Sequence, residues 1–233
     1  MDSYPLRPLA SRNNPTTLPQ LEAWLHASTK GRDWDGKLYV ASTIKWDGQE
    51  FSQCGCSPNY FAGWWTLACC KHDMRRSAPF QAKVKDYTIP TYIFTFARQD
   101  CAGQQALVSV AEIEKDFPTM QDYARFLVRS RNRKFRLSRL TRLAMKRGLG
   151  WRFGDCHSDE TGKVGEPNAE HVHAEPGQWR RDIDSTHLIL VSKRFILWDR
   201  PVFVSLKILK QSRFGYDVRA GNFGNILVKA GKK

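Results

Sequence analysis

The segment at residues 52–80, SQCGCSPNYFAGWWTLACCKHDMRRSAPF, concentrates side chains that can do chemistry. It contains four cysteines, one histidine, two adjacent tryptophans and three basic residues. Thiolates and imidazoles bind metal ions or act as nucleophiles and bases, and indole rings beside cations stack on nucleobases. The segment can therefore form a metal site, a reactive thiol site, or a buried hinge beside a surface that binds nucleic acid.

A zinc site would require four nitrogen or sulfur ligands, commonly supplied as Cys-x2-Cys pairs. The spacings in this segment are irregular, and neighbouring cysteines such as Cys69 and Cys70 rarely both bind one ion. Unpaired cysteine is among the most buried residue types, so we predict that these two pack inside the protein. We expect no cofactor and no metal. If zinc is bound, its ligands would come from Cys54, Cys56, Cys69, Cys70 and His72.

Cys70 is also a candidate nucleophile. A catalytic thiol needs nearby cations that lower its pKa and a base within reach. Basic residues follow Cys70 closely in the sequence, and His72 or Asp73 can carry protons. The candidate catalytic residues are therefore Cys70, His72 and Asp73, and the sequence leaves both an enzyme and a binding protein open.

The paired tryptophans and arginines favour nucleic-acid binding. Trp64 and Trp65 precede a basic turn, and flat rings beside cations suit stacking on an extruded base. Tryptophan pairs also serve protein cores, so we expect one ring to be buried and the other exposed. Adjacent arginines suit bidentate contact with phosphate. The predicted binding residues of this segment are Trp64, Trp65, Lys71, Arg75 and Arg76.

Positive charge is the strongest feature of the composition. The chain of 233 residues has a net charge of +14 and a pI near 9.7, which indicates a polyanionic partner such as DNA or a nucleotide. Residues 125–147 carry ten Arg or Lys and no acid, so the rest of the chain has a net charge of only +4. The basicity therefore belongs to one element.

Residues 125–147 are predicted to be helical, with a break near Ser130–Asn132, because Leu137, Leu140 and Ala144 recur at helical spacing. Ten uncompensated charges repel one another unless a partner neutralises them, which favours contact with a phosphate backbone. A solvated basic face and a helix on an anionic membrane surface are the alternatives. The residues predicted to contact phosphate are Arg129, Arg133, Arg136, Arg139, Arg142 and Lys146.

The remaining pattern predicts an α+β fold with a mixed or mainly antiparallel sheet, possibly barrel-like, and a few flanking helices. Helices are expected over residues 17–28 and from Thr119, which is a good N-cap. Residues 88–100 and 105–117 predict a hairpin, and further strands are expected over 37–46, 186–198 and 201–211. Residues 154–180 form a loop in which Asp155 either accepts a hydrogen bond from a base or ribose or serves as a turn residue.

The domain organisation follows from these elements. We predict an N-terminal tail and short helix at 1–36, then one α+β domain at 37–233 that carries the basic helical segment. No apolar run approaches the roughly 20 residues of a membrane span, and the polar N-terminus lacks a signal-peptide pattern. We therefore expect a cytoplasmic protein that does not enter a membrane and whose six cysteines are reduced thiols.

The stretch SPNYFAGWWTLACCKHDMRR resembles the signature of the nucleotide modification associated domain family, type two. The matching positions are Asn59, Phe61, Gly63, Thr66–Lys71 and the pair Arg75-Arg76, while Trp65 stands where the family has cysteine and His72 where it has proline. Weaker similarity extends to FGDCHSD and HLILVSKRFILWDR. The resemblance implies a phage or bacterial protein associated with modified nucleotides in DNA, and it transfers no catalytic role.

Three functions remain. The first is a DNA-binding or nucleotide-binding protein that recognises a modified base. The second is an enzyme that acts on a nucleotide or DNA base through Cys70 and His72. The third is a basic adaptor protein without base recognition. We predict the first, with DNA or a nucleotide as the partner.

Overall fold

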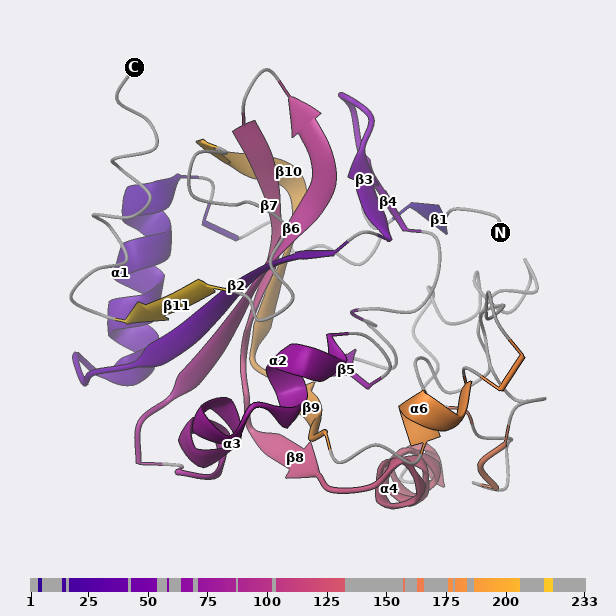
Figure 1. The fold of residues 1–233 in the computed structure, drawn as a ribbon. Coiled ribbons are helices and arrows are strands. Elements are labelled where there is room, and N and C mark those ends of the chain that lie inside the picture. Colours follow the sequence, from indigo (N-terminus) through magenta and orange to yellow (C-terminus); the bar gives the residue numbers. More distant parts are fainter. Residues whose placement is uncertain are drawn as a thin grey trace. The chain divides into compact units, whose positions relative to one another are not determined.

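The computed structural model describes residues 4–5, 14–15, 17–41, 43–53, 58, 64–68, 71–86, 88–101, 104–132, 157, 163–165, 176–177, 179–183, 187–205 and 216–219. The fold is α+β, as predicted from the sequence (Figure 1). The chain divides into two compact units built from discontinuous segments. Unit 1 comprises Gly55–Gln81 and Glu114–Lys193, and unit 2 comprises Asp2–Cys54, Ala82–Ile113 and Arg194–Lys233.

Unit 2 contains a mixed five-stranded sheet. Its strands, in spatial order, are β10 (Phe195–Ser205), β7 (Gln104–Glu112), β6 (Thr91–Cys101), β2 (Asp35–Ala41) and β11 (Tyr216–Arg219). The pair β2–β6 is parallel and the other pairs are antiparallel. Among the described strands no sheet closes on itself, so the barrel-like form is not seen.

The predicted hairpin is confirmed as β6 and β7, in which Cys101 pairs with Gln104 at the turn end. Residues 91–97 of β6 are buried on both faces of the sheet, which explains why this stretch is continuously apolar or β-branched instead of alternating. Tyr92 and Phe94 lie on one face, where their rings contact Trp34. Strand β6 is thus the centre of the core of unit 2.

Helix α1 (Leu18–Thr29) packs on that face through its Trp24 ring, which meets Tyr92 edge-on at 6.2 Å. It begins as predicted, because the hydroxyl of Thr17 accepts from the backbone N–H of Gln20. A small sheet of β1 (Tyr4–Pro5), β4 (Phe51–Gln53) and β3 (Ile44–Trp46) completes the described strands of unit 2. Helix α1 therefore belongs to the core of this unit, although the sequence placed it with the N-terminal tail.

Three predicted strands are divided in the structure. The strand predicted over 105–117 is β7 followed by β8 (Lys115–Phe117), which pair in different sheets. The strand predicted over 37–46 is β2 and β3, which pair in different sheets. The strand predicted over 186–198 is β9 (Ile189–Ser192) followed by β10, with a bend at Lys193–Arg194. The carboxylate of Glu114 accepts hydrogen bonds from the Lys193 N–H and the Ser192 hydroxyl, and these bonds stabilise the bend. Strand β10 then continues to Ser205 across a bulge between Leu197 and Val202. Residues 201–205 are therefore a strand as predicted, but they continue β10 instead of forming a separate strand, and 206–211 lie outside the described residues.

Unit 1 is a three-stranded antiparallel sheet with helices. Strand β9 lies between β5 (Trp65–Leu67) and β8 (Lys115–Phe117). Helix α4 (Met120–Asn132) packs its apolar face against this sheet, and α6 (Trp179–Ile183) adds Ile183 to the same core. The short helix α2 (His72–Arg76) follows β5. Helix α3 (Ala78–Lys85) follows α2, and the chain passes from unit 1 to unit 2 within it, after Gln81. None of the helices within the described ranges is long and apolar enough to cross a membrane.

The N-cap of α4 provides the first prediction. The hydroxyl of Thr119 accepts from the Asp122 N–H at 3.0 Å and donates to the Asp122 carboxylate at 2.7 Å. Thr119→Ala removes both bonds and should lower the free energy of unfolding by about 1 kcal/mol, measured by urea denaturation. Thr119→Ser keeps the hydroxyl and should stay within about 0.5 kcal/mol of the wild type. Equal losses in both variants would show that the methyl group, and not the cap, stabilises the helix.

Candidate functional site

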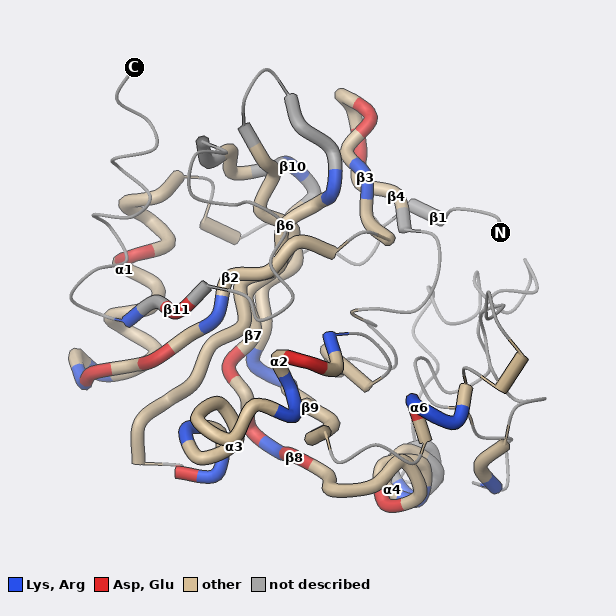
Figure 2. Tube along the Cα trace, in the orientation of Figure 1, with Lys and Arg blue, Asp and Glu red and all other residues tan. Residues whose placement is uncertain are grey.

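The candidate site is built on α2, which starts directly after a reversal of the chain. Lys71 has a φ of 61° and adopts the left-handed conformation that turns the backbone into the helix. The helix carries an acidic residue in its first turn and basic residues in its last (Figure 2), which complements the helix dipole. Met74 and Arg75 are buried, and Arg76 is exposed. His72 and Asp73 are half-buried.

Arg75 lies inside unit 1 and is 0% exposed. Its Nη1 donates to the carbonyl oxygen of Leu188 at 2.8 Å, just before β9. The Arg75 carbonyl in turn accepts from the Leu188 N–H at 3.4 Å and from the Gln81 side chain at 2.9 Å. These bonds connect α2 to the start of β9. They correct the expectation that Arg75 contacts phosphate, because the guanidinium has no exposed surface.

Asp182 of α6 brings two histidines together. Its Oδ2 lies 3.2 Å from Nε2 of His157, and its Oδ1 lies 2.6 Å from Nε2 of His72. The N–H of His72 is not aligned with that oxygen well enough for a hydrogen bond, so this contact is a close polar pair. Asp182 and His157 are buried, whereas the His72 side chain is 32% exposed. His72 is therefore the member of the cluster that solvent can reach.

His187 supports His72 from another side. The two rings stack with centroids 4.7 Å apart and an interplanar angle of 25°. His187 is buried and hydrogen-bonds to the backbone of Ala68, so its role is structural. Burial lowers the pKa of His187 from 6.5 to about 2, and the positive charge of Arg75 adds to this effect, as does that of His72 when His72 is protonated. The ring that stacks on His72 is therefore neutral.

The sequence identified His72 as a candidate but missed Asp182 and His157. They lie 110 and 85 positions downstream of it. His157 falls within the loop predicted over 154–180, and Asp182 falls between that loop and the strand predicted over 186–198. No spacing rule links residues so far apart. The signal that identifies them is tertiary: two histidines share the two oxygens of one buried carboxylate.

Both tryptophans of the predicted stacking pair lie in the interior. Trp65 is 0% exposed and Trp64 is 6% exposed, so the expectation of one exposed ring is wrong. Trp64 packs edge-on against Phe126 of α4 at 5.1 Å, and the ammonium of Lys193 lies over its ring at 4.4 Å. Strand β5 is covered by protein, which explains why neither ring offers a bare face to a base.

The other predicted site residues are placed as follows. Lys71 is half-buried, and Arg76 is exposed and forms an ion pair with Asp73. Arg129 is exposed on α4. The predictions that lie outside the described residues concern Cys54, Cys56, Cys69, Cys70, Arg133, Arg136, Arg139, Arg142, Lys146 and Asp155. Within the described ranges, no group of three or more His, Cys, Asp or Glu side chains is arranged to hold a metal ion.

Fold and site together define a two-unit α+β protein with a buried Arg–His–Asp cluster behind one accessible histidine. Comparison of the chain with protein-family models, with curated proteins and with solved structures finds no match.

The contrast between Arg75 and Arg76 can be tested. Arg75→Ala should lower the free energy of unfolding by about 3 kcal/mol, because it removes a buried cation and leaves the Leu188 carbonyl without that donor. Arg76→Ala removes an exposed ion pair and should cost less than about 1 kcal/mol. Urea denaturation followed by tryptophan fluorescence measures both. Similar losses for the two variants would contradict the structural role of Arg75.

His187 makes stability depend on pH. The unfolded chain binds a proton near the ordinary histidine pKa of 6.5, whereas the folded protein resists it down to about 2. Because the unfolded state binds more protons, stability falls as the pH drops below about 6.5. Between about pH 7.5 and about pH 5, the wild type should lose about 2 kcal/mol more than His187→Gln. Parallel pH curves for the two proteins, measured by denaturation, would contradict this assignment.

Proposed function

We propose that this protein binds nucleic acid through a cationic face of unit 1. The observation that carries the proposal is a set of four exposed arginines on two helices that pack together. Arg125 and Arg129 lie one turn apart on α4, and Arg180 and Arg181 are adjacent on α6. Helix α6 packs against α4, and Ile183 joins the core that α4 covers.

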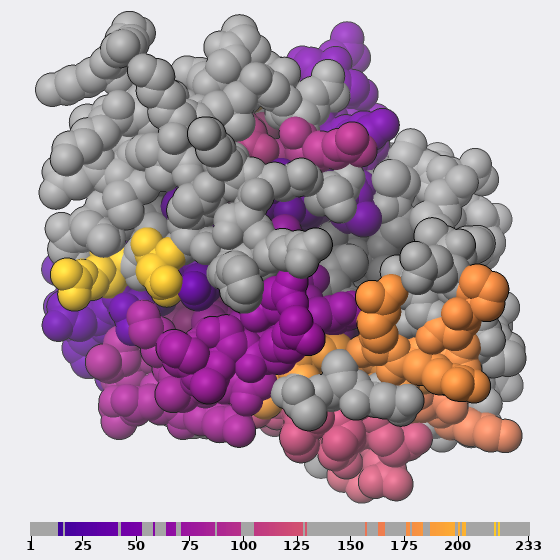
Figure 3. Space-filling model, viewed as in Figure 1, coloured from indigo at the N-terminus to yellow at the C-terminus, as the bar shows by residue number. Residues whose placement is uncertain are grey.

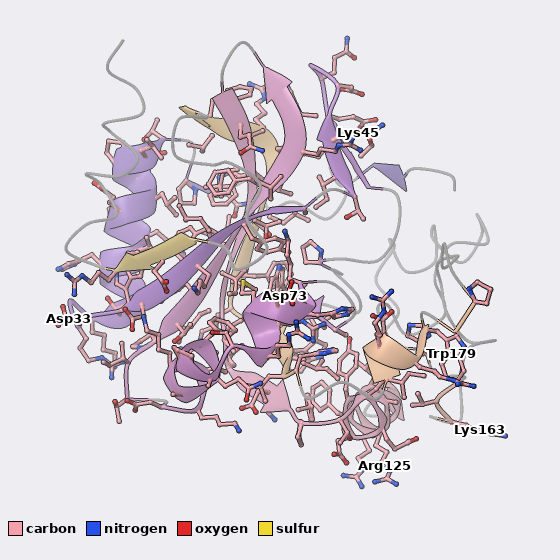
Figure 4. The ribbon with its side chains drawn as sticks, in the orientation of Figure 1. Asp33, Lys45, Asp73, Arg125, Lys163 and Trp179 are labelled. Atoms are coloured by element: carbon pink, nitrogen blue, oxygen red, sulfur yellow. The ribbon has the colours of Figure 1, made fainter. Side chains whose placement is uncertain are left out.

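The figures show how these charges are presented. Basic residues lie on both helices (Figure 2), and the two helices lie side by side on the molecular surface (Figure 3). Arg125 points outward from α4, and Trp179 lies on α6 (Figure 4). This face therefore combines cations with a half-buried aromatic ring, over which the Arg180 guanidinium lies at 5.6 Å.

Asp122 neutralises little of the charge of Arg125. Arg125 lies 3.5 Å from Asp122, and both side chains are exposed, so the pair contributes little energy and is screened by salt. Helix α4 also leads directly into the rest of the basic segment 125–147, which carries ten Arg or Lys and no acid. Such a concentration of positive charge is most simply stabilised by a polyanion with regularly spaced phosphates.

Base modification is the proposed context of this binding. The similarity of Thr66–Lys71 to the nucleotide modification associated family supports recognition of a modified nucleotide, in a cytoplasmic protein of phage or bacterial origin. With Trp64 and Trp65 in the core, Trp179 beside Arg180 is the aromatic side chain that we propose for stacking on a base, within the part of this face that the structure describes. Phosphate contacts give the affinity and carry no base information, so any preference for a modified base would come from such a ring.

The test is a salt titration with a short fluorescein-labelled DNA duplex. Replacing Arg125, Arg129, Arg180 and Arg181 with glutamine should weaken binding and lower the slope of log K against log salt by about 2 to 4, since each lost phosphate contact removes about 0.9. The control replaces four exposed cations of unit 2, which are Lys45, Lys85, Arg98 and Arg200. The control has the same change in net charge and should keep most of the slope.

Equal slopes for the two quadruple variants would show that binding follows net charge alone and would overturn the assignment to this face. The same titration with a duplex that carries hydroxymethylated cytosine tests the modified-base part of the proposal. Identical affinities for the modified and unmodified duplexes would show that the protein does not recognise hydroxymethylated cytosine. The proposal would then be reduced to binding of unmodified DNA.

A further inference from the structure

We propose that His72, held by Asp182, is a general base for the hydrolysis of phosphate esters. The site lies on α2 and α6 of unit 1 and does not use the arginines that carry the nucleic-acid proposal. It also does not require Cys70 as a nucleophile.

His72 has the environment of a catalytic histidine more than that of a core histidine. Its Nε2 lies 2.6 Å from a carboxylate oxygen and is itself inaccessible to solvent, yet the side chain is 32% exposed. The exposed part therefore belongs to other atoms of the ring and side chain. A histidine that served only packing would bury the whole ring, as His157 and His187 do.

The carboxylate selects the tautomer. An oxygen of Asp182 facing Nε2 favours the form with the proton on Nε2, which leaves the lone pair on Nδ1. The second Asp182 oxygen is held by His157 at 3.2 Å, so the carboxylate cannot turn freely. The Nε2–H of His72 is out of line with its oxygen in the free protein, and catalytic hydrogen bonds often align only when substrate binds.

The surrounding charges suit a phosphoryl substrate. His187 stacks on the ring as a neutral group and fixes its plane. Arg76 lies one helical turn from His72, and its side chain is 60% exposed while it pairs with Asp73. An exposed guanidinium beside an imidazole base can bind the non-bridging oxygens of a phosphate ester in a bidentate manner. Arg75 adds positive potential from the interior without touching solvent.

The reaction transfers one proton and exchanges one bond at phosphorus. Nδ1 of His72 takes a proton from water as the water oxygen forms a new bond to phosphorus. The bond between phosphorus and the ester oxygen breaks, and the leaving alcohol takes a proton from the imidazolium. The products are the alcohol and a phosphate with one ester bond fewer, and His72 returns to its neutral form. Asp182 acts as a positioning residue, which orients the ring and stabilises the imidazolium.

The experiment measures release of 4-nitrophenolate from bis(4-nitrophenyl) phosphate and from 4-nitrophenyl phosphate by the full chain. His72→Gln should lower kcat at least about 100-fold, the range expected for loss of a general base. Asp182→Asn should lower kcat about tenfold with little change in KM, because it removes the charge that supports the imidazolium. His26→Gln, an exposed histidine on α1 of unit 2, is the matched control and should keep wild-type activity.

Rescue separates chemistry from folding. Added imidazole should restore a measurable part of the activity of His72→Ala and none of the activity of Asp182→Asn, whereas a purely structural defect would not respond. Absence of turnover of both esters by the wild type would overturn the proposal, as would retention of activity within about twofold in His72→Gln. His72→Gln should bind duplex DNA like the wild type, so failure of this proposal is distinguishable from failure of the nucleic-acid proposal.

Discussion

The buried guanidinium of Arg75 is the constraint on which unit 1 depends. A cation removed from water must be surrounded by acceptors, and Arg75 obtains one from the Leu188 carbonyl at 2.8 Å. The backbone carbonyl of Arg75 also accepts a hydrogen bond from the Leu188 N–H. The side chain and the backbone of Arg75 therefore both connect α2 to the start of β9. This connection fixes His72 on α2 next to His187, which immediately precedes Leu188 in the chain. The accessible histidine is thus positioned by a residue that solvent never reaches.

Unit 1 contains charged groups both in its interior and on its surface, and they have different roles in the two places. In the interior, burial and the charge of Arg75 keep His187 neutral. The carboxylate of Asp182 lies against His72 and His157. On the surface, exposed arginines lie on the neighbouring helices α4 and α6. The same residue type therefore fixes the fold in one place and supplies a field for a polyanion in another. The proposed hydrolytic site and the proposed binding face use different residues, although α6 contributes Asp182 to the first and Arg180 and Arg181 to the second.

Unit 2 depends on strand β6, which is buried on both faces. Its neighbours β2 and β7 pair with it in parallel and antiparallel directions, and the Trp24 and Trp34 rings cover the face that carries Tyr92. Burial raises the pKa of the Tyr92 hydroxyl well above its usual value, and the nearby negative charge of Glu112, its hydrogen-bond partner, adds to this effect. Glu112 also forms an ion pair with Arg194 at 3.0 Å. The Tyr92 hydroxyl and the Glu112 carboxylate therefore both have partners within unit 2.

The sequence by itself determined what local interactions control: the α+β class, the β6–β7 hairpin and the caps at Thr17 and Thr119. Alternation, turn residues and capping hydroxyls act over a few positions, so their pattern is readable along the chain. Only the tertiary structure decided that Arg75 is buried while Arg76 is exposed, because adjacent helical residues point about 100° apart and the pattern does not say which face is covered. It also decided that Trp64 and Trp65 are both inside, that one apolar run divides between β9 and β10, and that Asp182 meets His72. These outcomes depend on contacts between segments far apart in the chain, for which a single sequence contains no periodic signal.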